Sequence, residues 1–211
     1  MKKLVLALSL LVGFTGRAQA APITFHSGDG GDVLVSSVVA GAVTPIAKHA
    51  VWGDVSPAAG LAADTAKWIS YANTGNGGIV APNMVGARVP ANATAHFRRT
   101  FNGSGDFNLW ILADDTATVL LNGVEIFAAV AGQVDPCAPG GTGKPIGCVL
   151  ADMGVYNTTL TSGLHTLDVY VYQTNASVFG TQYAASVPEP ATMALVGLGL
   201  LGASIARRRK P

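Results

Sequence analysis

The stretch 107–127, FNLWILADDTATVLLNGVEIF, decides the fold of this chain. Its first part alternates with a period of two residues, which predicts a β-strand with two distinct faces. One face holds Phe107, Leu109 and Ile111, and the other holds Asn108, Trp110 and Leu112. Because both faces are largely apolar, we predict a central strand that is covered on both sides.

The second part of this stretch predicts a β-hairpin. Asn122 and Gly123 separate the apolar runs TVLL and VEIF. Both residues tolerate the positive φ angles of a type I′ turn, so this pair is a strong hairpin signal. We therefore expect two short antiparallel strands joined at residues 122–123.

Further strands are predicted on either side of this region. They lie in the segments DVLVSSVVA (32–40), KHAVW (48–52), AHFRRTF (95–101), GLHTLDVYVYQ (163–173) and VFGTQYAASV (178–187). Short alternating runs bounded by Gly, Asn, Asp and Pro are typical of strands, and no long amphipathic helix stands out. About eight short strands without intervening helices predict an all-β domain, a β-sandwich or jelly roll.

The first twenty residues, MKKLVLALSLLVGFTGRAQA, have the three parts of a secretory signal. Two lysines precede an apolar run, and small residues precede the predicted cleavage after Ala20 by signal peptidase. A retained membrane anchor is the alternative, but the apolar run is shorter than the ~20 residues that a spanning helix needs. We expect residues 1–20 to be a signal peptide.

The last twenty-five residues form a second targeting segment. Pro188 and Pro190 hold Glu189 in an extended stretch that a processing enzyme could grip. The apolar run 191–206 makes roughly 24 Å of helix, slightly less than a ~30 Å hydrocarbon core. Four basic residues follow and should stay in the cytoplasm: Arg207, Arg208, Arg209 and Lys210. A permanent single-span anchor and a buried core helix are the alternatives.

This C-terminal pattern resembles the PEP-CTERM sorting signal of Gram-negative bacteria. The resemblance rests on the box Val187, Pro188, Glu189 and Pro190, followed by the apolar helix and the basic end. It implies that an exosortase cuts near the box after transient insertion in the inner membrane. It also implies a final place at the cell surface or in an extracellular, exopolysaccharide-containing matrix.

The body resembles the galactose-binding-like jelly rolls that often precede such tails. The phrases that carry this likeness are KWISYANTGNGG (67–78), AHFRRTF (95–101), LWILADDTATVLLNGVEIF (109–127), HTLDVYVYQTN (165–175) and FGTQYAASV (179–187). The resemblance implies a fold and leaves the ligand open. The expected organisation is a signal peptide with a short helix at 1–20, a β-sandwich domain at 21–186 and a sorting signal with a transmembrane helix at 187–211.

The charge of the predicted body excludes one class of partner. Between residues 21 and 186 there are six Lys or Arg and eleven acidic residues, a net charge of −5. An acidic surface without a basic stripe repels the phosphate backbone, so we expect no nucleic acid partner.

Cys137 and Cys148 are the two cysteines of the chain, and both lie in a Pro/Gly-rich loop of the predicted body. In an oxidising compartment they should form a disulfide. A metal site is the alternative, although no further thiol or His ligands lie nearby in sequence.

Three residues are candidates for ligand binding. Asp114 and Asp115 end the central strand, where carboxylates could hold a structural calcium ion and, through it, sugar hydroxyls. The alternative is that they cap backbone N–H groups at the turn. Tyr71, beside the Gly/Asn-rich stretch 73–78, is the best candidate for a surface ring that stacks on a sugar. No cofactor and no catalytic residue are expected, because no nucleophile motif is present.

Three functions remain open. The first is an exported, non-catalytic protein of the exopolysaccharide or biofilm matrix that binds carbohydrate. The second is a structural matrix protein that assembles through protein–protein contacts. The third is a secreted hydrolase that uses Asp114 and Asp115 as its acid pair.

Overall fold

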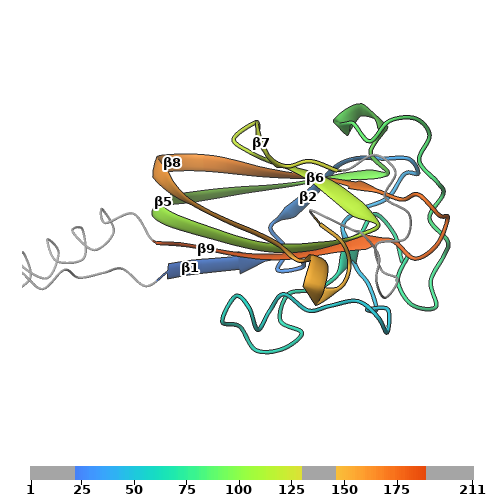
Figure 1. Cartoon of the computed structure of the whole chain (residues 1–211), viewed down its shortest axis with the longest axis horizontal. Coiled ribbons are helices and arrows are strands. Elements are labelled where there is room, and N and C mark those ends of the chain that lie inside the picture. The colour runs from blue at the N-terminus through green and yellow to red at the C-terminus, as the bar shows by residue number, and fades with distance from the viewer. Residues whose placement is uncertain (1–21, 130–145, 189–211) are drawn as a thin grey trace, which may run out of the picture.

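The computed structural model describes residues 22–129 and 146–188, and this part is an all-β sandwich (Figure 1). The described residues contain nine strands and two short 3₁₀ helices, joined by loops. Their order is β1 (Pro22–His26), β2 (Asp32–Ser37), β3 (Thr44–Pro45), β4 (Ile69–Ser70), η1 (Pro90–Asn92), β5 (Ala95–Asp114), β6 (Thr116–Leu121), β7 (Val124–Phe127), η2 (Leu150–Asp152), β8 (Gly154–Tyr172) and β9 (Gly180–Pro188). The prediction of a β-rich, sandwich-like body is confirmed.

Two long strands connect the layers of the sandwich. β5 and β8 pair antiparallel from Ala95↔Val171 to Ile111↔Gly154, with an irregularity between Gly103 and Gly105. Both strands turn back on themselves at one end of the molecule, which we call the bend end (Figure 1). The prediction of separate short strands at 95–101 and 107–112 is wrong, because the Gly-Ser-Gly segment bends the chain without ending its pairing.

Each half of the long strands belongs to a different sheet. The first sheet contains β2, the first half of β5, the second half of β8, β6 and β7. The second sheet contains β1, β9, the second half of β5 and the first half of β8, with β4 and β3 beyond β9. The two sheets face each other across the main core.

The main core holds the side chains that the alternating pattern assigned to one face. Phe107, Leu109 and Ile111 are fully buried there, as predicted. The predicted hairpin is also confirmed, since β6 and β7 flank Asn122 and Gly123, which have φ angles of 53° and 78°.

The outer face of the second sheet is partly covered by the loop between β3 and β4. Trp52 and Trp68 stack at 4.1 Å between ring centroids and pack with Leu112 and Ala184 in a second apolar cluster. The prediction that the central strand is covered on both sides is therefore confirmed at Leu112, whereas the outer face stays open at Asn108. The prediction of a strand at 48–52 is wrong. This segment forms part of the covering loop and does not pair in a sheet.

The two predicted targeting segments lie largely outside the described residues, and so do both predicted terminal helices. Within the described ranges, no helix is long and apolar enough to cross a membrane. β9 continues past residue 186, the predicted end of the body, to Pro188. Val187 pairs with Ile23 and Pro188 pairs with Pro22, so both residues belong to the sandwich.

Candidate functional site

Asp114 and Asp115 hold loops of the sandwich in place. Oδ2 of Asp114, a residue 3% exposed, accepts a hydrogen bond of 2.7 Å from Nε1 of Trp52. Oδ2 of Asp115, which is fully buried, accepts bonds of 2.5 Å from the backbone N–H and the hydroxyl of Thr174. Both carboxylates are therefore closed off from a sugar. No group of three or more potential metal ligands occurs within residues 22–129 and 146–188.

Tyr71 does not lie on the surface, so the prediction that its ring stacks on a sugar is wrong. The residue is 1% exposed and its ring packs on Phe179, with 5.6 Å between centroids. Burial raises the pKa of the Tyr71 phenol. Tyr71 directly follows β4 and lies two residues after Ile69, so both side chains face the main core.

The remaining predicted residues are only partly described. Cys148 is fully buried in the second apolar cluster, whereas Cys137 lies outside the described residues, so the disulfide stays a prediction. Glu189, Pro190 and the basic residues 207–210 also lie outside.

A row of small polar side chains crosses the open part of the second sheet's outer face. The strand register aligns Thr24 of β1 with Ser186 of β9, Ser186 with Asn108 of β5, and Asn108 with Asn157 of β8. We call these four residues the polar row. Four strands spaced about 4.8 Å apart give this row a length of roughly 14 Å.

The polar row retains most of its hydrogen-bonding capacity. Nδ2 of Asn108 donates one long bond of 3.4 Å to Oγ of Ser186. Among the residues that the structure describes, the side chains of Thr24 and Asn157 make no hydrogen bond. Each amide carries two N–H donors and an acceptor oxygen, and each hydroxyl both donates and accepts. The row can therefore bind a ligand that is rich in hydroxyl groups.

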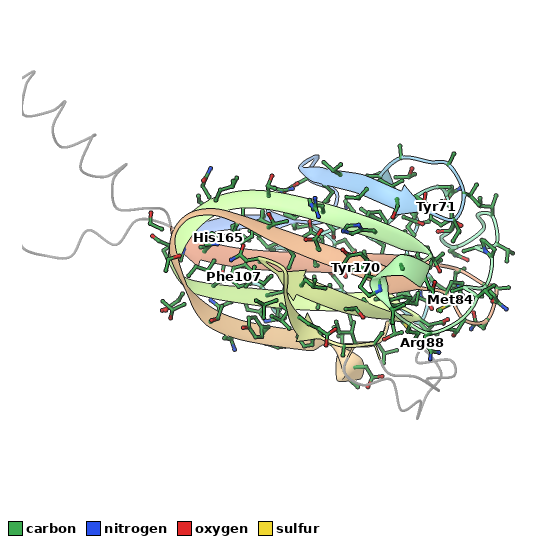
Figure 2. All side chains as sticks on the ribbon, turned by 90° about the horizontal axis from the view of Figure 1, so that it is seen from above. Tyr71, Met84, Arg88, Phe107, His165 and Tyr170 are labelled. Carbon is green, nitrogen blue, oxygen red and sulfur yellow. The ribbon has the colours of Figure 1, made fainter. Side chains whose placement is uncertain are left out.

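A groove of about 320 Å³ lies beside the polar row. Its lining residues are Asp106, Phe107, Asn108, Asn157, Thr158 and Thr159. The phenyl ring of Phe107 is buried in the core, and Figure 2 shows this residue toward the bend end. Asp106 supplies the one formal charge of this lining and accepts a 3.5 Å bond from the Thr159 hydroxyl.

Trp110 marks the border between the open and covered parts of this face. In the register it lies between Ala184 of β9 and Val155 of β8, one row away from the polar row. Its ring is half-buried and packs against the second apolar cluster. The exposed remainder offers an apolar edge next to the amides.

A second hollow of about 300 Å³ carries charged residues whose partners lie within the protein. Its lining includes Lys48, Lys67, Asp64 and Trp68. Nζ of Lys48 lies 3.5 Å from Oδ1 of Asp64, and Nζ of Lys67 donates a 2.6 Å bond to the Asp64 carbonyl. This hollow is therefore less suited to an external ligand than the groove.

The first sheet carries a compact polar cluster on its outer face. Oδ1 of Asp168 accepts from Nε of Arg98 at 2.7 Å and lies 2.6 Å from Nε2 of His96, whose ring stacks on Tyr170. Burial lowers the pKa of His96, and the contact with Asp168 opposes this only in part. This lowered pKa leaves His96 neutral near pH 7, and the nearby Arg98 charge acts in the same direction as burial. Since Asp168 is satisfied inside the protein, this cluster stabilises the sheet.

The residues of the polar row were not identified from the sequence. The alternation around Asn108 placed that amide opposite the core face, which was a usable signal. Thr24, Ser186 and Asn157 are ordinary strand residues, and only the register brings them beside Asn108.

The C-terminal segment matches a described sequence family. Residues 186–210 match the PEP-CTERM protein-sorting motif. The protein therefore carries an exosortase sorting signal, which indicates export and exosortase-mediated localisation at the cell surface or outside the cell. No curated protein matches the chain.

Two solved structures resemble the described fold remotely. One is a family 35 carbohydrate binding module from Clostridium thermocellum, at 9% identity and a TM-score of 0.33, covering 78% of this chain and 98% of that one. The other is an exo-β-1,3-galactanase from Phanerochaete chrysosporium in complex with galactose, at 14% identity and a TM-score of 0.28, covering 79% and 29%. Similarity at this level carries no argument about function.

Proposed function

We propose that this protein is a non-catalytic matrix protein, with a jelly-roll body that binds a neutral polysaccharide after exosortase processing. The observation that carries the proposal is the polar row, Thr24–Ser186–Asn108–Asn157, beside the half-buried Trp110. The binding surface comprises this row and the adjoining groove.

The chemistry of the row favours a sugar. Sugar hydroxyls donate and accept hydrogen bonds, as do the amides and hydroxyls of the row. The apolar part of the Trp110 ring suits the apolar face of a pyranose. An open row of roughly 14 Å across four strands fits several consecutive units of an extended chain.

Electrostatics favours a neutral glycan over an acidic one. The carboxylate of Asp106 is the one charge of the groove lining and can accept from a sugar hydroxyl. It would repel a uronate or sulfate group, and so would the net charge of −5 on residues 21–186. A neutral polysaccharide is therefore the preferred ligand class.

The groove supports binding rather than hydrolysis. Glycosidases that follow the common two-carboxylate mechanism hold the groups about 5–9.5 Å apart. The described lining of the groove supplies only Asp106. Asp114 and Asp115, proposed from sequence as an acid pair, are buried and bound to Trp52 and Thr174.

Glycan arrays and isothermal titration of the mature exported protein test this proposal. We expect binding to a neutral matrix polysaccharide, and we expect Asn108→Ala with Asn157→Ala to weaken it about tenfold or more, since each lost hydrogen bond is worth about 1 kcal/mol. Asn102→Ala is the matched control, because Asn102 is an exposed β5 amide away from the groove. Absence of glycan binding, or equal binding by the double variant, would contradict the proposal.

A second candidate function, structural assembly, is favoured by strand β2. In the described sheet β2 pairs only with β5, so its other edge is open. β2 and the two residues after it expose four valine side chains: Val33 (59%), Val35 (46%), Val38 (48%) and Val39 (48%). An apolar, unpaired strand edge is a template for pairing with another chain.

Sedimentation analysis distinguishes this second candidate from the first. Assembly through β2 predicts concentration-dependent oligomers that form without sugar and disappear in Val35→Lys. Val124→Lys is the matched control, because Val124 is an exposed valine on a different edge strand, β7. A monomer at all concentrations would contradict assembly through β2.

A further inference from the structure

The first two residues of the sorting box are part of the folded sandwich. Val187 is fully buried in the main core and pairs with Ile23 of β1. Pro188 is the last residue of β9 and pairs with Pro22, the first residue of β1. The sheet therefore continues into the matched sorting motif.

The bend of β5 receives these two residues. A Cβ atom at Gly103 would lie only 2.5 Å from Cγ2 of Val187, and one at Gly105 would lie 3.5 Å from Cγ of Pro188. A contact of 2.5 Å is not tolerated, and the β-branched side chain of Val187 has little freedom to move aside. The absence of a side chain at Gly103 thus makes room for Val187.

We propose that the folded sandwich sets the boundary of the exosortase substrate, so that cleavage occurs on the C-terminal side of Pro188. Gly103 is then a positioning residue for processing, because it lets Val187 pack into the core and keeps the end of β9 in the sheet. The proposal builds on the sorting motif and is independent of the glycan site.

The physical reason is the accessibility of the peptide backbone. The cut breaks one amide C–N bond: the body keeps the acyl group, which passes to water or to an amine acceptor, and the tail leaves with a free amine. An enzyme must grip this bond in an unpaired, extended segment. The peptide bond before Pro188 lies within the β1–β9 ladder, and the side chain that precedes this bond is buried. An enzyme can therefore reach the bond only after β9 has opened locally from β1.

Both ends of the described body lie at the bend end (Figure 1). Pro22 faces Pro188 across the β1–β9 ladder. The predicted signal-peptidase cut after Ala20 leaves one residue before β1. The two predicted processing events therefore act on segments that adjoin the same strand pair.

The test is the intact mass of the mature protein, purified after expression of the full chain in a strain that has exosortase. The expected C-terminal residue is Pro188 or a later one. A mature wild-type chain that ends at Val187 or earlier would overturn the proposal. This reading does not depend on glycan binding, so its failure is distinguishable from failure of the proposed function.

The positioning role of Gly103 is tested by Gly103→Ala. The added Cβ should displace Val187, and upstream cleavage should rise about tenfold, which corresponds to about 1.4 kcal/mol of local stability. Gly123→Ala is the glycine control: its φ of +78° makes an alanine there strained, and the added Cβ meets nothing within 4 Å, so this variant strains the β6–β7 turn without displacing Val187. Val119→Ala controls for general loss of core stability, since Val119 is fully buried on β6.

A milder variant keeps the test decisive if Gly103→Ala is not exported. Ile23→Gly weakens the β1 strand that pairs with Val187, at a side chain that is 37% exposed. It should shift cleavage in the same direction by about threefold, for a strand-propensity cost below about 1 kcal/mol. Wild-type cut sites in this variant, or an equal shift in Val119→Ala, would overturn the positioning role.

Discussion

The outer face of the second sheet has two halves that share the strands β5 and β9. One half is covered by a loop, and the other is open to solvent. In the covered half, Leu112 and Ala184 lie beneath the loop that carries Trp52 and Trp68. In the open half, Asn108 and Ser186 of the same strands stay at the surface beside the groove. Only the side chains and the passing loop differ between the halves.

This difference shows how one sheet face can serve both stability and binding. Apolar side chains in the covered half give the loop area to remove from water, which is the main gain on folding. Polar side chains in the open half offer no such gain, because covering them without partners would cost free energy. The open half therefore keeps its hydrogen-bonding groups for a ligand.

The largest expected effect comes from breaking the covered half. Trp52→Ala removes the ring that stacks on Trp68 and donates to Asp114, so the free energy of unfolding should fall by about 3–5 kcal/mol. Chemical denaturation measures this loss. A loss below about 1 kcal/mol would show that the loop contributes little to stability. Glycan binding should persist under conditions in which the Trp52→Ala variant is folded.

Acid should loosen the covered half before the open half. Burial raises the pKa of Asp54, but hydrogen bonds from the backbone of Asp64 and from Ser56 outweigh it, so the pKa lies below the ordinary value of 3.8. The stability that this carboxylate contributes is present above that value and is lost as the pH falls through the folded pKa.

Tryptophan fluorescence between pH 5 and pH 2 measures this acid effect. Asp54→Asn should reduce the change below about pH 4, because the titrating group that ties the loop together is gone. Asp106→Asn, in the open half, is the control and should keep the wild-type acid transition. Identical transitions in wild type and Asp54→Asn would contradict this role.

The smallest expected effect on stability belongs to the open half. Asn157→Ala removes an exposed amide that makes no hydrogen bond within the described residues, so the free energy of unfolding should change by less than about 0.5 kcal/mol. Thermal melting checks this value. A loss above about 2 kcal/mol would mean that Asn157 has a structural role and that the two halves are less distinct.

Much of the fold follows from local patterns. The alternation at 107–112 and the Asn122–Gly123 turn depend on neighbouring residues only, and both predictions are confirmed. The strand prediction at 48–52 failed because its apolar residues lie in a covering loop. A loop that packs on a sheet has the same local pattern of apolar residues as a short strand.

The predicted ligand residues failed for a related reason. Tyr71 sits beside glycines and asparagines, which suggested a surface position, yet its ring lies in the core. Asp114 and Asp115 looked available at the end of a strand, but loops distant in sequence supply Trp52 and Thr174 as their donors. Burial of a polar or aromatic residue depends on contacts with residues distant in the chain, and the residues next to it in sequence do not determine those contacts.

The sequence by itself determined the sorting signal, the β-rich class and the apolar core face, because each is written in a contiguous run or a fixed period. The tertiary structure alone decided where the bend of β5 lies, that Val187 and Pro188 belong to the sheet, and that four strands align their polar side chains. Those features depend on strand register and on contacts between residues far apart in the chain, and no local pattern specifies which strand will lie beside which.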